Sequence, residues 1–458
     1  MESSLPSGRK TVLLITTLPS FLIPFMGSSI NVALPSIGEE FAMDAVLLGW
    51  VATAYLLSTA IFLVPFGRIS DILGRKKIFF WGVTLYTFSC LLTTLSTSAM
   101  WLIAFRGFQG IGSSMVFGTS VAILISVFPA NERGKALGIN VAATYSGLSL
   151  GPFLGGLLTQ YLGWRSIFWI HIPLGLMVIG FASWKLKGEW AEAQGERFDI
   201  KGSMLYGLSL AVMIYGISLL PAKSGILLGG IGFLGILGFI RYEMKIESPI
   251  FDINLFSRNR VFAYSNLAAL INYSATFAVS FLLSFYLQYT KGFSPPKAGT
   301  ILISQPVIQA IFSPFAGRLS DRIEPRIVAS MGMALTAAGL FFLTFLTQDT
   351  TVPFIIASLM LLGFGFALFS SPNTNAVMSS IDKKFYGVAS GTLGTMRVIG
   401  MMLSMGTVMI IFSIYMGRIQ IRPEYYPLLL TSIKVAFVIF AFLCIAGVFA
   451  SIVRGKVR

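Results

Sequence analysis

The sequence predicts an all-α integral membrane protein with fourteen transmembrane helices, and three observations predict it. The chain of 458 residues is 55% hydrophobic and only 11% charged, whereas a soluble domain carries about 25% charged residues. Long apolar segments recur along the chain, each near the ~20 residues that a helix needs to cross the hydrocarbon core. Lys and Arg also concentrate in alternate loops, as expected when basic loops stay on the cytoplasmic side.

The apolar segments set the boundaries of the predicted spans. The first is too long for a signal-peptide core and is expected to stay as a helix. The seventh and eighth are short and are separated only by Leu220-Pro221-Ala222-Lys223. The predicted spans are residues 11–37, 46–66, 78–97, 100–128, 136–160, 166–186, 202–220, 224–241, 262–289, 298–317, 327–347, 352–374, 388–412 and 429–452.

The loop charges support this number of spans and give the orientation. With a cytoplasmic N-terminus, 24 of the 33 Lys and Arg residues fall in inner segments, six in outer loops and three within spans. One misplaced span would invert the alternation after it. We therefore expect both termini to be cytoplasmic and the chain to be a multi-pass protein of the plasma (inner) membrane.

Composition also excludes several functions. The formal net charge of +15 is explained by basic inner loops, so no nucleic-acid partner is expected. One histidine and two cysteines inside apolar runs, Cys90 and Cys444, leave no basis for a metal site or a disulfide. No cofactor is expected.

An internal repeat divides the chain. Gly67 to Asp71 reads GRISD after a Pro-Phe pair, and residues 317–321 read GRLSD after another. Paired glycines open the fifth and thirteenth spans at nearly the same offset, which marks a repeat. The predicted units are residues 1–187, a six-helix half; 188–258, an inserted hairpin (202–241) with flanking loops; and 259–458, a second six-helix half running the same way through the membrane.

The loop after the second span carries the pattern G-x-x-x-D-x-x-G-R-K. Gly67 and Gly74 permit a tight turn between two helices. Asp71 places a negative charge where the positive N-terminus of a helix could approach, and Arg75 holds the loop at the anionic inner leaflet. Asp321 takes the matching place in the second half. The alternative is a solvated basic loop.

Two further patterns lie inside spans. Arg106-Gly107-Phe108-Gln109-Gly110 places a cation within the fourth span, where a charge marks function by default; the alternative is an arginine that reaches the outer interface. The fifth span contains small residues four apart, which let helices pack backbone to backbone, and a proline that bends the helix. These residues are Gly147, Gly151, Pro152, Gly155 and Gly156.

The start of the sixth span, residues 164–175, holds the single histidine. Trp164 and Trp169 suit the membrane interface. His171 could titrate near neutral pH, which makes it a candidate proton site; the alternative is a packed neutral histidine.

Over nearly the whole chain these patterns resemble the major facilitator superfamily, in particular its 14-span drug:proton antiporter branch. Residues 67–77 are similar to the superfamily's cytoplasmic loop signature, and residues 147–156 to the antiporter signature G-x-x-x-G-P-x-x-G-G. The thirteenth span has Gly400 and Ser404 at the equivalent places but no proline. The resemblance implies alternating access between the halves, a cytoplasmic latch at Asp71 and Asp321, and multidrug efflux in exchange for protons.

One departure from the branch concerns the coupling ion. The branch usually places an acid in the first span, in a pattern like L-D-x-T-x-x-N-x-A-L-P, but residues 25–35 have Met26 at that position. All 18 acidic residues fall outside membrane depth in the predicted topology, whereas Arg106 and Arg397 lie within spans. We therefore expect the substrate cavity to favour neutral or anionic amphipathic compounds. Its candidate residues are Asn31, Arg106, Gln109, Asn266, Asn272, Asn373, Asn375 and Arg397.

The leading interpretation is a secondary transporter that exports small amphipathic, drug-like organic compounds, with protons as the candidate counter-ion. The alternatives are a lipid or anionic-amphiphile translocator without proton coupling, and a non-transporting membrane receptor. An enzyme is not expected, because the chain has no H-E-x-x-H, G-x-S-x-G or phosphate-loop pattern. The expected partners are the substrate and the lipid bilayer, and the expected functional unit is a monomer.

Overall fold

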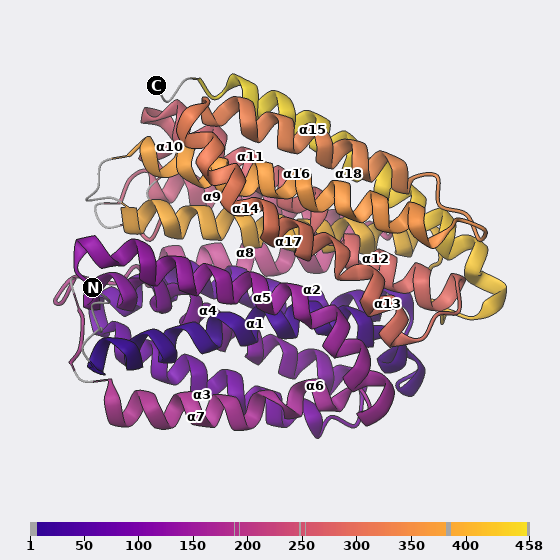
Figure 1. The fold of residues 1–458 in the computed structure, drawn as a ribbon, viewed down its shortest axis with the longest axis horizontal. Helices are drawn as coiled ribbons and strands as arrows, with labels where there is room; N and C mark the ends of the chain where they lie inside the picture. Colours follow the sequence, from indigo (N-terminus) through magenta and orange to yellow (C-terminus); the bar gives the residue numbers. More distant parts are fainter. Residues whose placement is uncertain are drawn as a thin grey trace.

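The structure is a computed structural model that describes residues 7–186, 188–191, 193–246, 249–251, 253–381 and 386–455. In these ranges the regular structure is helical, apart from an isolated β-bridge between Asp44 and Gln420. The helices form two bundles side by side, with the first part of the chain in one and the last part in the other (Figure 1). The beginning of α1 and the end of α18 lie at the same end of the molecule, at the left of Figure 1.

The first bundle follows the predicted order closely. Asp44 and Ser98 accept hydrogen bonds from backbone N–H groups at the starts of α2 and α4, which satisfies donors that a helix leaves free. The sixth predicted span is broken at Ile170 because Pro173 has no N–H for the carbonyl of Trp169. The helices are α1 (Ser7–Glu40), α2 (Ala45–Leu73), α3 (Arg75–Thr94), α4 (Ala99–Val127), α5 (Ala130–Leu162), α6 (Arg165–Trp169) and α7 (His171–Lys185).

The second part of the chain begins with the hairpin and continues into the other bundle. Several predicted spans here consist of consecutive helical pieces; Pro306, for example, cannot donate to Leu302 at the end of α13. The elements are α8 (Ile200–Ser218), α9 (Lys223–Glu243), α10 (Asn254–Arg258), α11 (Arg260–Thr276), α12 (Val279–Phe285), the π-helical turn η1 (Tyr286–Thr290), α13 (Pro295–Leu302), α14 (Ser304–Arg322), α15 (Pro325–Leu343), α16 (Val352–Ser379), α17 (Tyr386–Tyr415), the 3-10 turn η3 (Pro423–Tyr425) and α18 (Tyr426–Val453).

Thirteen of the described helical segments are long and apolar enough to cross a membrane. Each of the fourteen predicted spans coincides with helix, but α3, over the third predicted span, is not among the thirteen. Three basic residues open α3 and several Thr and Ser residues follow, which lowers its hydropathy. Its twenty residues pack against α4 and α7. A fourteenth crossing through α3 is therefore a proposal.

The inserted hairpin touches both bundles. α8 packs against α2 in the first bundle and α17 in the second. The Tyr206 hydroxyl donates to the carbonyl of Ala60 (3.0 Å), and the Arg418 Nη2 donates to the carbonyl of Ser218 (3.5 Å). The hairpin therefore spans the seam between the halves.

The base of the hairpin holds a buried carboxylate that the predicted topology placed in an inner loop. Glu243, at the end of α9, is only 1% exposed, and one of its oxygens accepts from the backbone N–H of Phe251 (3.0 Å). Asp199 caps α8 by accepting from the N–H of Gly202 (2.9 Å). A Cβ atom on Gly202 would collide with both carboxylates, which explains why a glycine occupies this position.

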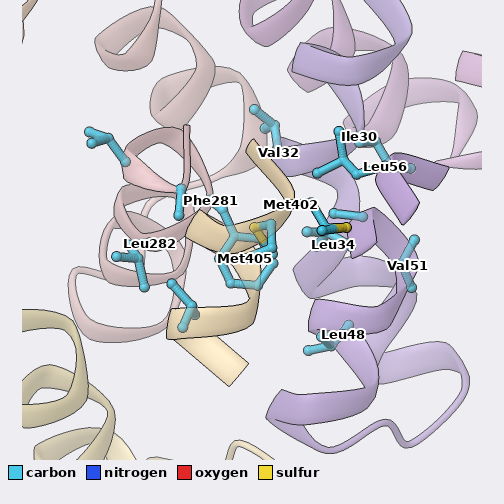
Figure 2. Close-up of a cluster of buried hydrophobic side chains, with 14 of the residues drawn as sticks. Ile30, Val32, Leu34, Leu48, Val51, Leu56, Phe281, Leu282, Met402 and Met405 are labelled. Atoms are coloured by element: carbon cyan, nitrogen blue, oxygen red, sulfur yellow. The ribbon is translucent and has the colours of Figure 1, made fainter. Parts of the chain in front are cut away.

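The halves meet through an apolar seal (Figure 2). Its labelled side chains are at most 4% exposed and belong to one continuous core. Figure 2 shows Met402 and Met405 of α17 between the side chains of the first half and Phe281 of the second. We use the name outer seal for Ile30, Val32, Leu34, Leu48, Val51, Leu56, Phe281, Leu282, Met402 and Met405.

Polar contacts between the halves lie at the same end as the outer seal. The Gln288 Nε2 donates to the carbonyl of Val32 (2.9 Å), and the Thr53 hydroxyl contacts the sulfur of Met409 (3.3 Å). Arg418 forms an ion pair with Asp44 (3.8 Å). These pairs join segments predicted to face the outside.

Glycines on the long helices show how closely the two halves pack at each end of the molecule. A Cβ on Gly49 would lie 2.9 Å from Met409, and one on Gly156 would lie 2.5 Å from the carbonyl oxygen of Pro295, in both cases across the seam between the halves. Near the other end, a Cβ on Gly138 of α5 or Gly391 of α17 would meet nothing within 4 Å. At these glycines the described halves therefore meet closely at the ends predicted to face outside and are open at the ends predicted to face inside, which with the predicted orientation is the packing of an inward-facing conformation.

Candidate functional site

The candidate substrate site centres on Arg397 of α17, which is half-buried. Its Nη2 donates to the hydroxyl of Thr374 on α16 (2.7 Å), and its guanidinium lies 5.7 Å from the ring centre of Tyr273 on α11. Its Nε is buried with no hydrogen-bond partner among the described residues. We use the name Arg397 cluster for Arg397, Thr374 and Tyr273.

The Arg397 cluster combines a cation with aromatic surface. Tyr273 packs edge-to-face on Phe366 (ring centres 5.2 Å apart), and Tyr145 of the other half lies nearby. An arginine with a free donor and no carboxylate partner binds anions or carbonyl oxygens best. The adjacent rings suit the apolar part of an amphipathic molecule.

Two further amides are poorly satisfied inside the second half. Both polar atoms of the buried Asn272 side chain, and the buried Oε1 of Gln305, have no hydrogen-bond partner among the described residues. Buried polar groups are normally paired, so these amides are available to a polar ligand. The sequence interpretation included Asn272 but missed Gln305. A glutamine next to a proline, here Pro306, belongs to no sequence pattern that marks a binding residue.

Arg106 lies inside the first half, which corrects its expected position in a cavity between the halves. It is 1% exposed, its Nε donates to the carbonyl of Val51 (3.1 Å), and Nη1 donates to Gln109. Its guanidinium lies 4.6 Å from the ring centre of Tyr55, and the Gln109 amide contacts the Cys90 sulfur (3.1 Å). Arg106 and Gln109 therefore connect α2, α3 and α4.

We expect Arg106→Leu to destabilise the protein without abolishing substrate binding. The change leaves the buried Gln109 carbonyl unpaired, which costs about 1–3 kcal/mol. Thermal unfolding of the detergent-solubilised protein measures the loss. The double variant Arg106→Leu/Gln109→Leu should recover part of the stability because it removes both partners. Normal stability with lost binding in the single variant would contradict this role.

Asn266 and Asn373 lie within the second half, and Asn373 is bound by a residue that the sequence interpretation missed. The Asn373 amide donates to the carbonyl of Ser265 (3.0 Å) and its Oδ1 accepts from Arg454 Nη1 (3.0 Å). The Asn266 amide donates to the carbonyl of Phe262 (2.9 Å). Arg454, counted from sequence as a loop charge, is fully buried, and burial lowers its pKa to about 10.

The last two candidate asparagines are not part of the Arg397 cluster, although Asn375 follows Thr374 along α16. Asn375 donates to Ser320 (3.1 Å) and Asp321 (3.4 Å) at the end of α14, so it supports the second gate loop. Asn31 is buried in α1, next to Val32, whose carbonyl accepts across the outer contact. Of the eight predicted cavity residues, only Arg397 belongs to the Arg397 cluster as defined.

The gate loop is held by the linker that leads to the hairpin. The φ of Gly74 is 110°, a conformation that favours glycine, and Gly67 lies within α2. Asp71 pairs with Arg75 (2.8 Å), and its carbonyl accepts from the N–H of Ala193 (2.9 Å). This arrangement differs from the predicted latch, in which Asp71 would face a helix of the other half when the inner side is closed.

The linker makes further contacts with α2 and α3. The N–H of Arg75 donates to the carbonyl of Trp190 (2.9 Å), and the N–H of Lys76 donates to the Glu189 carboxylate (2.8 Å). Glu189 therefore satisfies a free donor at the N-terminus of α3, as a cap does. Arg68 also pairs with Glu196.

We expect Glu189→Ala to loosen the linker and the first turn of α3. Loss of a cap costs about 1 kcal/mol, so hydrogen exchange at residues 74–78 and 188–197 should become faster. Glu132→Ala removes an inner-side carboxylate, the partner of Arg9 (3.3 Å), and serves as the matched control. Equal exchange in the two variants would contradict the capping role.

The antiporter-like segment of α5 packs on two neighbours at once. A Cβ on Gly147, Gly151 or Gly155 would collide with α1, and Ser29 of α1 donates to the carbonyl of Gly151 (2.9 Å). Gly156 instead faces α13 of the other half. The carbonyl of Pro152 also lies against α13, at Gly299. The segment is therefore part of the contact between the halves.

His171 lies at the start of α7, between α1, α3 and α6. It is 1% exposed. Its Nδ1 lies 2.7 Å from the carbonyl oxygen of Ile167, and its Nε2 lies 3.0 Å from the carbonyl oxygen of Leu22 on α1.

Comparison with known proteins agrees with this architecture. The sequence profile described as Major Facilitator Superfamily matches residues 17–405 and again residues 265–456. The chain belongs to the Major Facilitator Superfamily. As a member of that superfamily it is a transporter and not an enzyme, and the many membrane-spanning helices follow from that fold.

The named relatives include a transporter, a multidrug resistance protein and an export protein. The chain is 31% identical to the riboflavin transporter RibZ of Clostridioides difficile (strain 630), over 84% of each protein. It is 30% identical to the multidrug resistance protein Stp of Mycobacterium tuberculosis (strain ATCC 25618 / H37Rv), covering 85% of this chain and 73% of that protein. It is 29% identical to the cephamycin export protein CmcT of Amycolatopsis lactamdurans, covering 87% and 84%.

Solved structures show the same fold at low sequence identity. A bacterial homologue of the human lysosomal transporter Spinster, in an inward-facing and unoccupied conformation, matches with a TM-score of 0.72 at 16% identity, over 98% of each chain. The human organic anion transporter MFSD10 (TETRAN) matches with a TM-score of 0.67 at 15% identity, over 98% of this chain and 100% of that one.

Proposed function

We propose that this transporter exports small amphipathic organic compounds, neutral or anionic, by alternating access. The observation that carries the proposal is the half-buried Arg397, whose Nε has no partner and which pairs with a hydroxyl. A buried cation without a counter-ion favours a ligand that supplies negative charge or carbonyl oxygens. The relatives that export antibiotics and drugs support the direction of transport.

Alternating access is supported by the difference in packing between the two ends of the fold. The outer seal and the polar contacts at Val32 and Asp44 close the outer side in this conformation. The other conformation would separate these contacts and bring the inner ends together, where Asp71 could reach a helix N-terminus of the opposite half. The two predicted halves, residues 1–187 and 259–458, would be the moving bodies.

Transport into sealed vesicles tests the proposal. The purified protein is reconstituted in liposomes, and uptake is followed for taurocholate, riboflavin and ethidium as anionic, neutral and cationic probes. Uptake of the anionic or neutral probe, reduced in Arg397→Gln, is the expected result. Ethidium uptake that is unaffected by Arg397→Gln would overturn the proposed substrate class.

A lipid translocator is the second candidate, because a phosphate headgroup would suit Arg397 as well as a soluble anion does. The same vesicles, made with a fluorescent phosphatidylglycerol, distinguish the two. Protein-dependent movement of that lipid between leaflets, with no movement of taurocholate or riboflavin, would support the lipid function.

A further inference from the structure

Both ring nitrogens of His171 face oxygens that can only accept a hydrogen bond. Nδ1 lies 2.7 Å from the carbonyl oxygen of Ile167 and Nε2 lies 3.0 Å from that of Leu22. A neutral imidazole has one N–H, so one of these contacts would set a nitrogen lone pair against a carbonyl oxygen. The geometry is satisfied only when both nitrogens carry protons.

We propose that His171 is a proton-binding site, that it is doubly protonated in this inward-facing conformation, and that its proton is the one exchanged for substrate. The last part rests on the proposed transport function. Within the described residues, His171 has what the first span lacks: a titratable side chain, fully enclosed by transmembrane helices, at a contact between two of them.

Two aromatic rings beside the imidazole favour a cation. The rings of Phe25 and Tyr86 lie 5.8 and 6.1 Å from it, centre to centre, and aromatic faces attract positive charge at about this distance. Burial and the positive charge of Arg106 on α4 act in the opposite direction. The two carbonyl acceptors act in favour of the protonated ring, although burial is the largest single effect.

The other groups that face His171 are not acids. From α3 it meets Tyr86, beside which lies the thiol of Cys90. From α1 and α6 it meets the two carbonyls, and from α4 the charge of Arg106. No carboxylate of the described chain is paired with it, so the proton is held by main-chain oxygens and rings, which makes its affinity depend on where α1 lies.

The helix that supplies the Leu22 oxygen, α1, is interrupted by prolines near that residue. Pro19 and Pro24 flank Leu22. Neither has a backbone N–H, so two hydrogen bonds of the helix are missing there. A cavity of about 10 Å³, with Leu22, Ile23 and Val116 in its wall, adjoins the ring. Farther along, α1 forms the outer contact at Val32. A shift of α1 that withdraws the Leu22 oxygen weakens proton binding, and by linkage protonation resists that shift.

The exchange step needs only water as the acceptor of the proton. When the Leu22 oxygen withdraws, the Nε2–H bond breaks, the proton passes to water and the electron pair stays on the ring, which becomes the neutral tautomer protonated at Nδ1. Rebinding reverses the step. For one proton to be exchanged per cycle, the release occurs toward the inner side as substrate binds there, and rebinding occurs from the outer side.

Because His171 is the single histidine of the chain, its protonation can be observed directly. The full-length protein, purified with a tag that contains no histidine, is labelled with ¹⁵N-histidine and placed in nanodiscs. Nitrogen NMR at pH 7.5 should show two protonated ring nitrogens in wild type, at a pH where a free histidine is mostly neutral. A neutral tautomer at pH 7.5 would overturn the site, whatever the transport assay shows.

The coupling role is tested separately with a pH-sensitive dye inside the vesicles. Riboflavin or taurocholate uptake should move protons in wild type, and His171→Gln should lose that proton movement while still binding the probe. Proton movement equal to wild type in His171→Gln would overturn the coupling role. Uptake without proton movement in wild type would also overturn it, but would leave the proposed transport function standing.

Discussion

Gly156→Leu is expected to hold the transporter with its outer side open and to stop transport. Gly156 lies on α5, and a Cβ there would already be 2.5 Å from the carbonyl oxygen of Pro295 in the other half. A leucine needs more room than that contact allows. The clash exists only while the outer ends are together, so it penalises one conformation and not the fold.

The size of the effect follows from the cost of overpacking. Inserting methylene groups into a close contact costs about 1–3 kcal/mol, which shifts the equilibrium between the two conformations roughly 5- to 150-fold. Gly147, Gly151 and Gly155 pack instead on α1 within the same half. Leucine at those positions should damage folding of the first bundle.

Distances between spin labels measure the shift. Labels at Met100 and Asp349, both exposed in outer segments of opposite halves, should move apart in Gly156→Leu. Gly138→Leu is the matched control, because a Cβ on Gly138 of the same helix meets nothing within 4 Å. An unchanged distance together with normal transport in Gly156→Leu would contradict the role assigned to this contact.

The all-helical membrane fold could be predicted from the sequence because lipid imposes strong constraints on it. A segment of ~20 apolar residues has few alternatives to a helix in hydrocarbon. The division at residues 187 and 259, inferred from the duplicated GRISD and GRLSD loops, stays a prediction. The spacing of Gly147, Gly151 and Gly155 likewise predicted a backbone contact, since that spacing is itself the geometry of a helix face.

The side on which a polar residue lies could not be predicted. Arg106 and Arg397 are both cations inside spans, yet one joins helices within a half and the other forms the Arg397 cluster. The difference depends on the rotation of each helix about its axis, which tertiary packing sets. Arg454 shows the same limit, because the sequence placed it in a basic loop and packing buries it against Asn373.

The carbonyl contacts of His171 were also beyond sequence reasoning. The partners are main-chain oxygens of Ile167 and Leu22, and every residue has such an oxygen. Patterns of side chains carry no information about them. Only the approach of α1 to α7 identifies which carbonyl is met.

Arg397→Gln is expected to weaken binding of taurocholate about 10- to 150-fold and to leave a neutral probe such as riboflavin much less affected. A hydrogen bond to a charged group contributes about 1.5–3 kcal/mol, and glutamine keeps a donor but removes the charge. Thr374 and Tyr273 stay in place, so the apolar part of the site is preserved. The change should therefore alter selectivity more than stability.

Arg397→Lys separates charge from geometry in the same site. Lysine restores the positive charge but not the planar guanidinium. In wild type that group donates to Thr374 through Nη2 and leaves Nε free for a ligand. Binding of taurocholate measured by calorimetry should fall between wild type and Arg397→Gln. Lys434, which lies within the fourteenth predicted span on α18 and outside the Arg397 cluster, gives the control Lys434→Gln. If that control weakens taurocholate binding as much as Arg397→Gln does, the effect comes from the overall charge of the membrane-embedded part and not from the Arg397 cluster.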